Sequence, residues 1–184
     1  MQIEKIPMSN SDIDTYLPNS KILTNIDIQK YNDIDQIFTK SPKTQYIILL
    51  FIDDDKDNSQ SGHWCCLSKY GDKEDQFIEF FDSYGNTPDG VYDFIDDKKA
   101  KKLGIQKYYL TDLLDKCKYE VCYNPIQYQS QKDDISTCGR HVVYRLITLL
   151  GKGIILPLYY KLLKNFKDTT KKNYDEIVSV LINL

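Results

Sequence analysis

The pattern of hydrophobic and polar positions predicts a group of strands in the middle of the chain. Residues 46–52 form a short apolar run rich in Ile and Leu, which is typical of a strand buried on both faces. Residues 62–70 and 76–85 alternate between apolar and polar positions, and the second of these strands ends at Asp82, before a turn. Residues 119–129 return to strand character, so we expect a small sheet.

Apolar positions three and four residues apart predict helices around these strands. The order of the elements predicts an α+β fold, in which a small mixed sheet packs against a central helix at residues 138–150. Pro157 suits the first turn of the helix that follows. The other expected helices run from Asn10 or Ser11 to Leu17, over residues 31–39, 91–100, 108–116 and 157–167, and from a cap at Thr169 or Thr170 to Ile182.

The length and composition fit one domain. With 184 residues, 41% of them hydrophobic, the chain can bury about 70% of its unfolded surface around one core. We expect a single domain over residues 1–184, made of an N-terminal helical portion (1–44), a core (45–150) and C-terminal helices (151–184). No apolar run is long enough to cross a bilayer, and residues 1–11 lack the apolar stretch of a signal peptide. We therefore expect a soluble, intracellular protein that is not secreted.

Cys138 is the first candidate for chemistry, because it precedes Gly139 where the apolar helical pattern begins. At a helix N-terminus, the backbone N–H groups and the helix dipole favour the thiolate, which is the nucleophilic form. Gly139 is expected to keep the approach to the thiol open. For an isolated Cys-Gly pair, a buried structural cysteine is the ordinary alternative. The chain has five cysteines, an odd number, which favours reduced thiols over a disulfide framework.

His63 and Asp82 supply the two other groups that a catalytic thiol needs. His63 lies in an expected strand, where it can act as the general base. Asp82 ends the next strand and can orient the imidazole, although an Asp in a turn has a structural role as well. Glu79 is the reserve acid, since a period of two places it on the opposite strand face. His141, the other histidine, lies one turn after Cys138, which favours a packing role or a substrate contact.

The segments GHWCCL, FFDSYG and STCGRH together resemble the clan of cysteine peptidases that contains the adenovirus proteases and the ubiquitin-like-protein-specific proteases. The resemblance covers residues 45–150. It implies a fold that is papain-like in the broad sense, and a thiol endopeptidase with His63, Asp82 and Cys138 as its triad. The segment TCGRHVVYR is similar to the corresponding segment of maturation proteases of virophages, Polinton-like elements and large DNA viruses.

The same resemblance implies a glutamine before the nucleophile, whose side chain binds the oxyanion together with the backbone N–H of Cys138. Gln127, Gln129 and Gln131 fall on one face if the strand continues, so periodicity does not separate them. The number of residues between the glutamine and the cysteine in adenoviral enzymes favours Gln131. The glutamines of the family usually close an apolar strand, which favours Gln129, and we select Gln129. Trp64, beside the base, is expected to line the substrate cleft.

The resemblance further implies partners. The natural substrates would be capsid and other virion precursor proteins of the same element, cut after small residues such as Gly-Gly or Gly-X. Cleavage would occur in the host cytoplasm or viral factory and in the virion. A ubiquitin or ubiquitin-like deconjugating protease and an acyltransferase of the same clan are the alternatives. Related adenoviral enzymes use DNA and a disulfide-linked peptide as activators, and Cys117 or Cys122 lies in the region of the linking cysteine.

No metal or organic cofactor is expected. Cys65 and Cys66 are adjacent on a strand and point to opposite faces, so only one of them can join His63 in a metal site. The spacing of Cys117 and Cys122 is not that of a zinc motif.

Charge is unevenly distributed around a net value of −3. Residues 1–60 hold six lysines and ten acidic residues, whereas residues 141–184 hold seven Lys or Arg and three acidic residues. The C-terminal lysines can form a face that tracks phosphates, as an activating DNA would require. The outer faces of two amphipathic helices are the better interpretation of these lysines.

Overall fold

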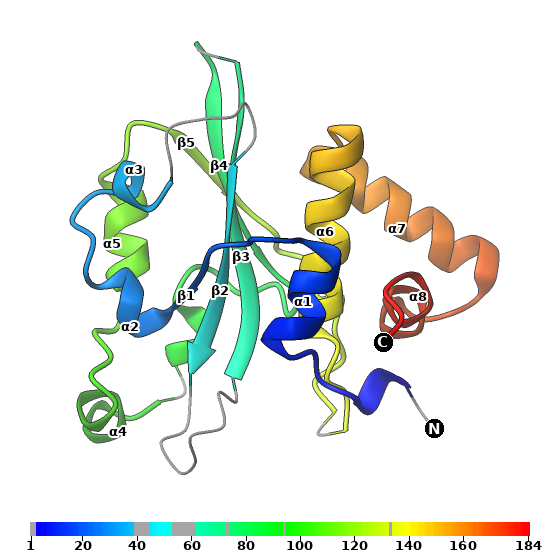
Figure 1. The fold of residues 1–184 in the computed structure, drawn as a ribbon, viewed down its shortest axis with the longest axis horizontal. Helices are drawn as coiled ribbons and strands as arrows, with labels where there is room; N and C mark the ends of the chain where they lie inside the picture. Colours follow the sequence, from blue (N-terminus) through cyan, green and yellow to red (C-terminus); the bar gives the residue numbers. More distant parts are fainter. Residues whose placement is uncertain (1–2, 39–44, 53–61, 73, 94, 133) are drawn as a thin grey trace. The chain divides into compact units, whose positions relative to one another are not determined.

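The computed structural model describes residues 3–38, 45–52, 62–72, 74–93, 95–132 and 134–184 (Figure 1). The backbone forms two compact units, which are described separately. The sheet unit consists of Lys21–Asp82 and Asn86–Pro125. The helical unit consists of the residues up to Ser20 together with Ser83–Gly85 and Ile126–Leu184. The expected single domain over residues 1–184 stays a prediction.

A five-stranded mixed sheet forms the centre of the sheet unit. The strands are β1 (Ile22–Thr24), β2 (Gln45–Ile52), β3 (Gly62–Gly71), β4 (Gln76–Asp82) and β5 (Glu120–Tyr123), in the order β1-β2-β3-β4-β5. The two pairs β2–β3 and β3–β4 are antiparallel, while the edge strands β1 and β5 run parallel to their neighbours. The α+β class and the mixed sheet that the sequence predicts are therefore confirmed.

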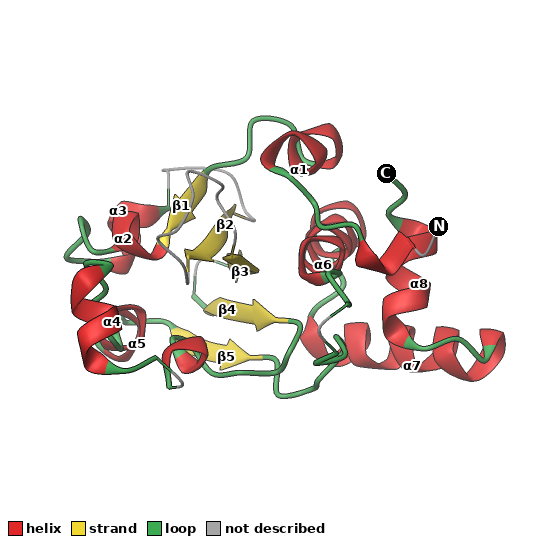
Figure 2. Cartoon of the chain, turned by 90° about the horizontal axis from the view of Figure 1, so that it is seen from below, coloured by secondary structure: helices red, strands yellow, loops and turns green. Residues whose placement is uncertain are grey.

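Short helices cover one face of this sheet (Figure 2). Alternate strand residues such as Leu49, Cys65 and Phe80 point to this face and pack with Ile28 and Leu110 of the helices into one core. Most of the helices begin at side-chain caps, for example the Thr24–Asp27 capping box of α2. The elements are α2 (Asn25–Ile28), α3 (Ile34–Ile37), the 3₁₀ helix η2 (Gly90–Tyr92), α4 (Asp97–Lys102) and α5 (Tyr109–Asp115).

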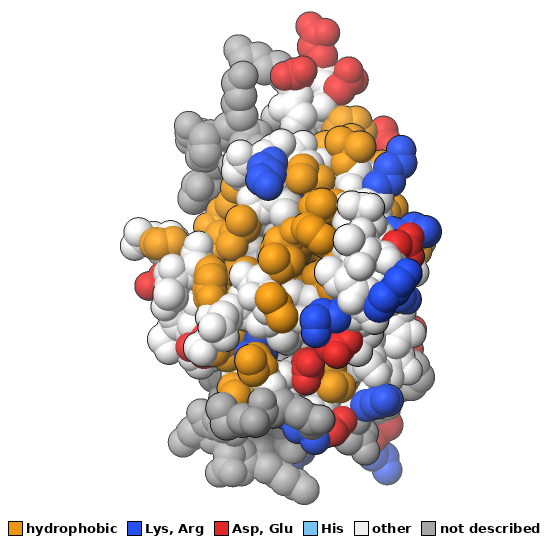
Figure 3. Space-filling model, turned by 90° about the vertical axis from the view of Figure 1, so that its right-hand side faces the viewer, with side chains coloured by type: hydrophobic (Ala, Val, Ile, Leu, Met, Phe, Trp, Pro, Cys, Tyr) orange, Lys and Arg blue, Asp and Glu red, His pale blue; other side chains and the backbone are white. Residues whose placement is uncertain are grey.

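The helical unit is built around α6 (Cys138–Lys152), which is buried along most of its length. It contacts α8 (Tyr174–Leu181) and α1 (Asn10–Tyr16). The 3₁₀ helix η1 (Ile3–Lys5) and α7 (Leu156–Thr170) complete the unit. Apolar side chains gather on the face where α7 and α8 lie (Figure 3). Exposed large hydrophobic residues of the last three helices and their connections are Ile147, Leu150, Ile155, Leu158, Val180 and Leu181.

Several expected boundaries are wrong. The three-residue strand β1 falls within the portion predicted as helical, because so short a run has no readable period. The expected helix 91–100 is replaced by η2 and α4, and Asp96 caps α4. Thr169 and Thr170 lie inside α7, and Asn173 caps α8.

Among the described residues, no single helix combines the length and apolar composition that a bilayer crossing requires. The helices α6 and α7 meet that requirement only when taken together across a bend of 117°.

Candidate active site

His63 and Asp82 meet at one end of the sheet. Asp82 is the last residue of β4 and lies opposite Cys65 of β3, two residues after His63, so strand periodicity puts all three on one face. The His63 Nε2 and Asp82 Oδ1 atoms are 2.6 Å apart. The Asp82 side chain is fully buried, and the His63 side chain retains 15% exposure. The predicted base and its orienting acid are therefore hydrogen-bonded.

Asp82 is held by two asparagines. Asn86 Nδ2 donates to Asp82 Oδ2 at 2.8 Å, and Asn124 Nδ2 donates to the Asp82 carbonyl at 2.7 Å. An ionised Asp82 accepts the Nε2–H of His63, which selects the tautomer whose Nδ1 is the basic nitrogen. Neither asparagine was identified from the sequence, although Asn86 follows the DSYG turn and Asn124 follows β5.

Glu79, the reserve acid, is engaged elsewhere. It is fully buried on β4, and Tyr70 Oη donates to its Oε2 at 2.9 Å. Burial, followed by the charges of Glu79 and Cys122, raises the pKa of Tyr70 well above its ordinary value, so this phenol remains a donor. Glu79 thus bonds to Tyr70 while Asp82 bonds to His63, and the catalytic role of Asp82 stays a prediction.

Cys138 is the first residue of α6 and is partly exposed. The N-cap residue, Thr137, makes no side-chain cap, because its hydroxyl donates to Asp175 instead. The thiol thus occupies the end of a 15-residue helix where the dipole favours an anion. This is the local setting that the sequence predicts.

Gly139 has a packing role that the sequence did not indicate. It is buried, and a Cβ built at this position would lie 2.8 Å from Met8 Cβ. The glycine therefore allows the N-terminal segment to pack against the first turn of α6. The expectation that Gly139 keeps the approach to the thiol open stays a prediction.

The N-terminal segment makes further contacts near Cys138. Ser136 N donates to the Glu4 carbonyl at 2.8 Å, and the buried Arg140 donates from Nη1 to the Ile6 carbonyl at 2.5 Å. Arg140 Nε also donates to the Ile182 carbonyl at 3.3 Å. The start of α6 is thus bonded to residues far before it and far after it in sequence, which no sequence motif indicated.

Gln129 is the buried member of the three candidate glutamines. It is 2% exposed, whereas Gln127 and Gln131 are exposed. Ser83 Oγ donates to Gln129 Oε1 at 2.8 Å, and Gln129 Nε2 donates to the Ile135 carbonyl at 3.3 Å.

The strand argument for these glutamines is corrected. Strand β5 ends at Tyr123, so the glutamines do not share one face of a strand. The role of Gln129 in an oxyanion hole stays a prediction.

Trp64 follows His63 on β3 and therefore points to the opposite face of the sheet, and it is 4% exposed. The contact of Trp64 with substrate stays a prediction.

Three possible metal ligands lie at the end of the sheet where His63 and Asp82 meet. The ligand atoms of His63, Cys65 and Asp82, among the described residues, lie within 4.8 Å of one another. Nitrogen, sulfur and oxygen donors of this kind suit zinc. Cys65 is the cysteine on the His63 side, as the alternation of strand faces requires. However, two of the three ligands already bond to each other, and the absence of a metal cofactor stays a prediction.

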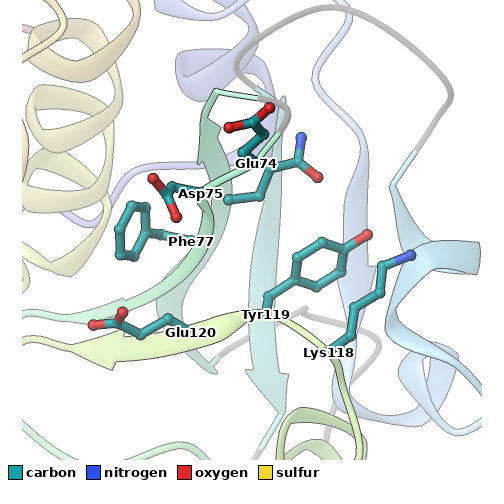
Figure 4. Close-up of a pocket in the computed structure, with 7 residues that line it drawn as sticks. Glu74, Asp75, Phe77, Lys118, Tyr119 and Glu120 are labelled. Atoms are coloured by element: carbon teal, nitrogen blue, oxygen red, sulfur yellow. The ribbon is translucent and has the colours of Figure 1, made fainter.

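A pocket of about 410 Å³ opens at the other end of β3 and β4 (Figure 4). Glu74, Asp75, Phe77 and residues 118–120 line it. It lies near the start of β4, whereas Asp82 ends that strand. This pocket is thus distinct from the His63–Asp82 pair.

The comparisons with known proteins give one relative and several structural likenesses. No family model matches the chain. The chain is 17% identical to the ASFV pS273R protease, with a TM-score of 0.44, and covers 61% of it with 83% of its own length. It is 15% identical to a de-sumoylating protease, with a TM-score of 0.41, and covers 74% of it with 97% of its own length. The chain thus spans about three fifths of the ASFV protease.

The relative is the "Uncharacterized protein V9" of Sputnik virophage. The two sequences are 34% identical over 180 residues, which cover 97% of this chain and 95% of V9. The chain therefore belongs to the protein family of Sputnik virophage V9.

Proposed function

We propose that this protein is a cysteine endopeptidase in which Cys138 is the nucleophile, His63 the general base and Asp82 the orienting acid. Gln129 and the backbone N–H of Cys138 are the proposed oxyanion donors. The observation that carries the proposal is the 2.6 Å bond between His63 Nε2 and Asp82 Oδ1. A buried carboxylate bonded to a partly exposed imidazole is the arrangement that keeps a histidine basic and oriented.

The proposed reaction has two steps. His63 Nδ1 takes the proton of Cys138, and the thiolate attacks the scissile carbonyl, whose oxygen becomes an oxyanion. Collapse breaks the C–N bond, and the imidazolium gives its proton to the leaving amine. Water, deprotonated by His63, then attacks the thioester, which releases the new carboxyl terminus and regenerates the thiol.

We propose virion precursor proteins as the substrates, cut after small residues. Two observations support this class. The segment TCGRHVVYR resembles viral maturation proteases, and the V9 relative comes from a virophage. The proposed sites of action are the infected cell and the particle.

Alkylation of the thiols tests the proposed pair. We expect iodoacetamide at about pH 6 to label Cys138 far faster than the other four cysteines, and this preference to disappear in His63→Ala. Mass spectrometry of the modified peptides measures both rates. Equal, slow labelling of all five thiols would contradict the assignment.

A bifunctional reagent tests the meeting of the two groups directly. 1,3-Dibromoacetone loses one bromide to the Cys138 thiolate and the second to a nearby imidazole nitrogen. We expect a Cys138–His63 bridge in the peptide map, and no bridge in Cys138→Ala. A bridge from Cys138 to a different residue would reject His63 as the base.

A substrate panel tests the reaction class. The panel contains capsid precursors of the same element, ubiquitin-like protein conjugates and acetyl-CoA with acceptor peptides. Cleavage of the precursors, abolished in Cys138→Ala, supports the proposal. Cleavage of the conjugates alone indicates a deconjugating protease, and acetyl transfer alone indicates an acyltransferase.

A further inference from the structure

Asp175 lies in the first turn of α8 and is 4% exposed. Its carboxylate joins three segments of the helical unit. Oδ2 accepts the backbone N–H of Ser130 at 3.0 Å, and Oδ1 accepts the Thr137 hydroxyl at 2.5 Å. The His141 Nε2 atom lies 3.2 Å from the same Oδ1. A single buried side chain thus links the loop around residue 130 to the first turn of α6.

Two of the residues that bond to Asp175 are sequence neighbours of the proposed oxyanion donors. Ser130 is adjacent in sequence to Gln129, and Thr137 is adjacent to Cys138. These neighbours are the two residues whose N–H groups are proposed to bind the oxyanion. The carboxylate therefore fixes the chain one residue away from each proposed donor.

A ring contact strengthens the same link. The Tyr128 ring stacks on His141, with centroids 6.1 Å apart and an interplanar angle of 24°. Tyr128 N and Gln129 N both donate to the Ser83 carbonyl, at 2.8 and 2.9 Å. The loop is thus held on two sides, by Ser83 and by the Asp175–His141 group.

The carboxylate is ionised at neutral pH. Burial acts to raise the pKa of Asp175, but hydrogen bonds from His141, Thr137 and the Ser130 N–H outweigh it and hold the pKa below its ordinary value. A buried anion with three donors keeps a fixed geometry, because each lost donor would leave charge unsatisfied.

We infer that Asp175 is a positioning residue, which sets the distance between the Gln129 amide and the Cys138 N–H by holding Ser130 and Thr137. The inference rests on the proposed function. It predicts that Asp175 affects reactions that pass through an oxyanion and leaves the intrinsic reactivity of the thiol unchanged.

Two reagents separate these effects. p-Nitrophenyl acetate acylates Cys138: the thiolate attacks the ester carbonyl, the oxygen becomes an oxyanion, and p-nitrophenolate leaves. Iodoacetamide alkylates the same thiolate by displacing iodide at a saturated carbon, so no oxyanion forms. The Cys138→Ala protein measures the contribution of the other thiols to each rate.

In Asp175→Asn, we expect acylation to slow about 10–100-fold while alkylation changes less than about twofold. The matched control is Asp168→Asn, an exposed acid of α7 that pairs with Lys164, for which neither rate should change. In Gln129→Ala, acylation should fall similarly, and adding Asp175→Asn should lower it little further. Equal losses of both rates, or no loss of either, would overturn the inference.

A milder pair of variants covers the case in which Asp175→Asn does not fold. Thr137→Val removes the hydroxyl donor and keeps the side-chain shape, and Thr137→Ser restores a hydroxyl. We expect Thr137→Val alone to slow acylation selectively, about 3–10-fold. Identical rates in the two variants would reject the role of the Thr137–Asp175 bond. A failure of the proposed function would give a different result, because Cys138 of the wild-type protein would then react with neither reagent faster than the other thiols.

Discussion

The two units hold their parts of the proposed active site in different ways. In the sheet unit, His63 and Asp82 are 19 residues apart, and the register of one antiparallel strand pair brings them together. In the helical unit, Arg140 is bonded to carbonyls 134 and 42 residues away. Strand register fixes the His63–Asp82 pair, whereas long-range side-chain bonds fix the helix that begins at Cys138. Substitutions of His63 or Asp82 should therefore affect mainly chemistry, whereas substitutions of Arg140 should affect stability as well.

The largest effect is expected at the His63–Asp82 pair. Asp82→Asn keeps the side-chain shape but favours the wrong imidazole tautomer, so the cleavage rate should fall about 10⁴-fold. The thermal unfolding midpoint should change little if Asn86 and Asn124 retain their bonds. Peptide cleavage and a thermal melt measure the two effects. A large loss of stability with little loss of rate would show that this pair is structural.

Arg140→Met should mainly destabilise the protein. Methionine fills the space of the aliphatic stem, but the Ile6 and Ile182 carbonyls lose their donor, which should lower the free energy of unfolding by about 2–4 kcal/mol. Urea denaturation measures the change. Lys152→Met, at the exposed last turn of the same helix, is the control and should be nearly neutral.

Two glycines of α6 offer a matched comparison. Gly139→Ala puts a Cβ within 2.8 Å of Met8 Cβ and should cost about 1–3 kcal/mol of unfolding free energy. Gly151→Ala meets no atom within 4 Å and should instead stabilise the protein by about 0.5–1 kcal/mol. Chemical denaturation of both variants gives the difference. If Gly139→Ala were as stable as Gly151→Ala, the packing of Met8 would have no energetic role.

The smallest effect concerns acid stability in the sheet unit. Burial acts to raise the pKa of Asp35, but bonds from Lys69, Tyr119 and Lys118 outweigh it and lower the pKa from 3.8 to about 2. A lowered pKa adds stability above pH 3.8, which is lost as the pH falls towards 2. Asp35→Asn should therefore flatten the pH dependence of the unfolding midpoint between pH 4 and pH 2. An unchanged slope in the variant would show that other carboxyl groups dominate.

The end of the sheet that holds His63 and Asp82 was predictable from local patterns. A continuous apolar run indicated β2, while strand periodicity and turn residues indicated β3 and β4 and placed Asp82 at the end of its strand. They could not place Asn86 and Asn124, since an asparagine in a turn has many local uses.

The helical unit was less predictable. The helix start at Cys138 follows from its apolar pattern, but the reason for Gly139 lies in Met8, which is 131 positions earlier in the printed sequence. Asp175 has no motif, and its importance depends on the three residues that it contacts. Tertiary contacts of this kind leave no periodic signal in a single sequence.

The bonds of Arg140 also bear on the order in which the surroundings of Cys138 form during synthesis. The Ile6 carbonyl leaves the ribosome before Arg140, but the Ile182 carbonyl leaves it 42 residues after Arg140. Both strands that hold His63 and Asp82 precede Arg140 in sequence, whereas the Ile182 carbonyl follows it. The framework around the proposed thiol would thus be completed only after Ile182 has been made, later than the strand pair.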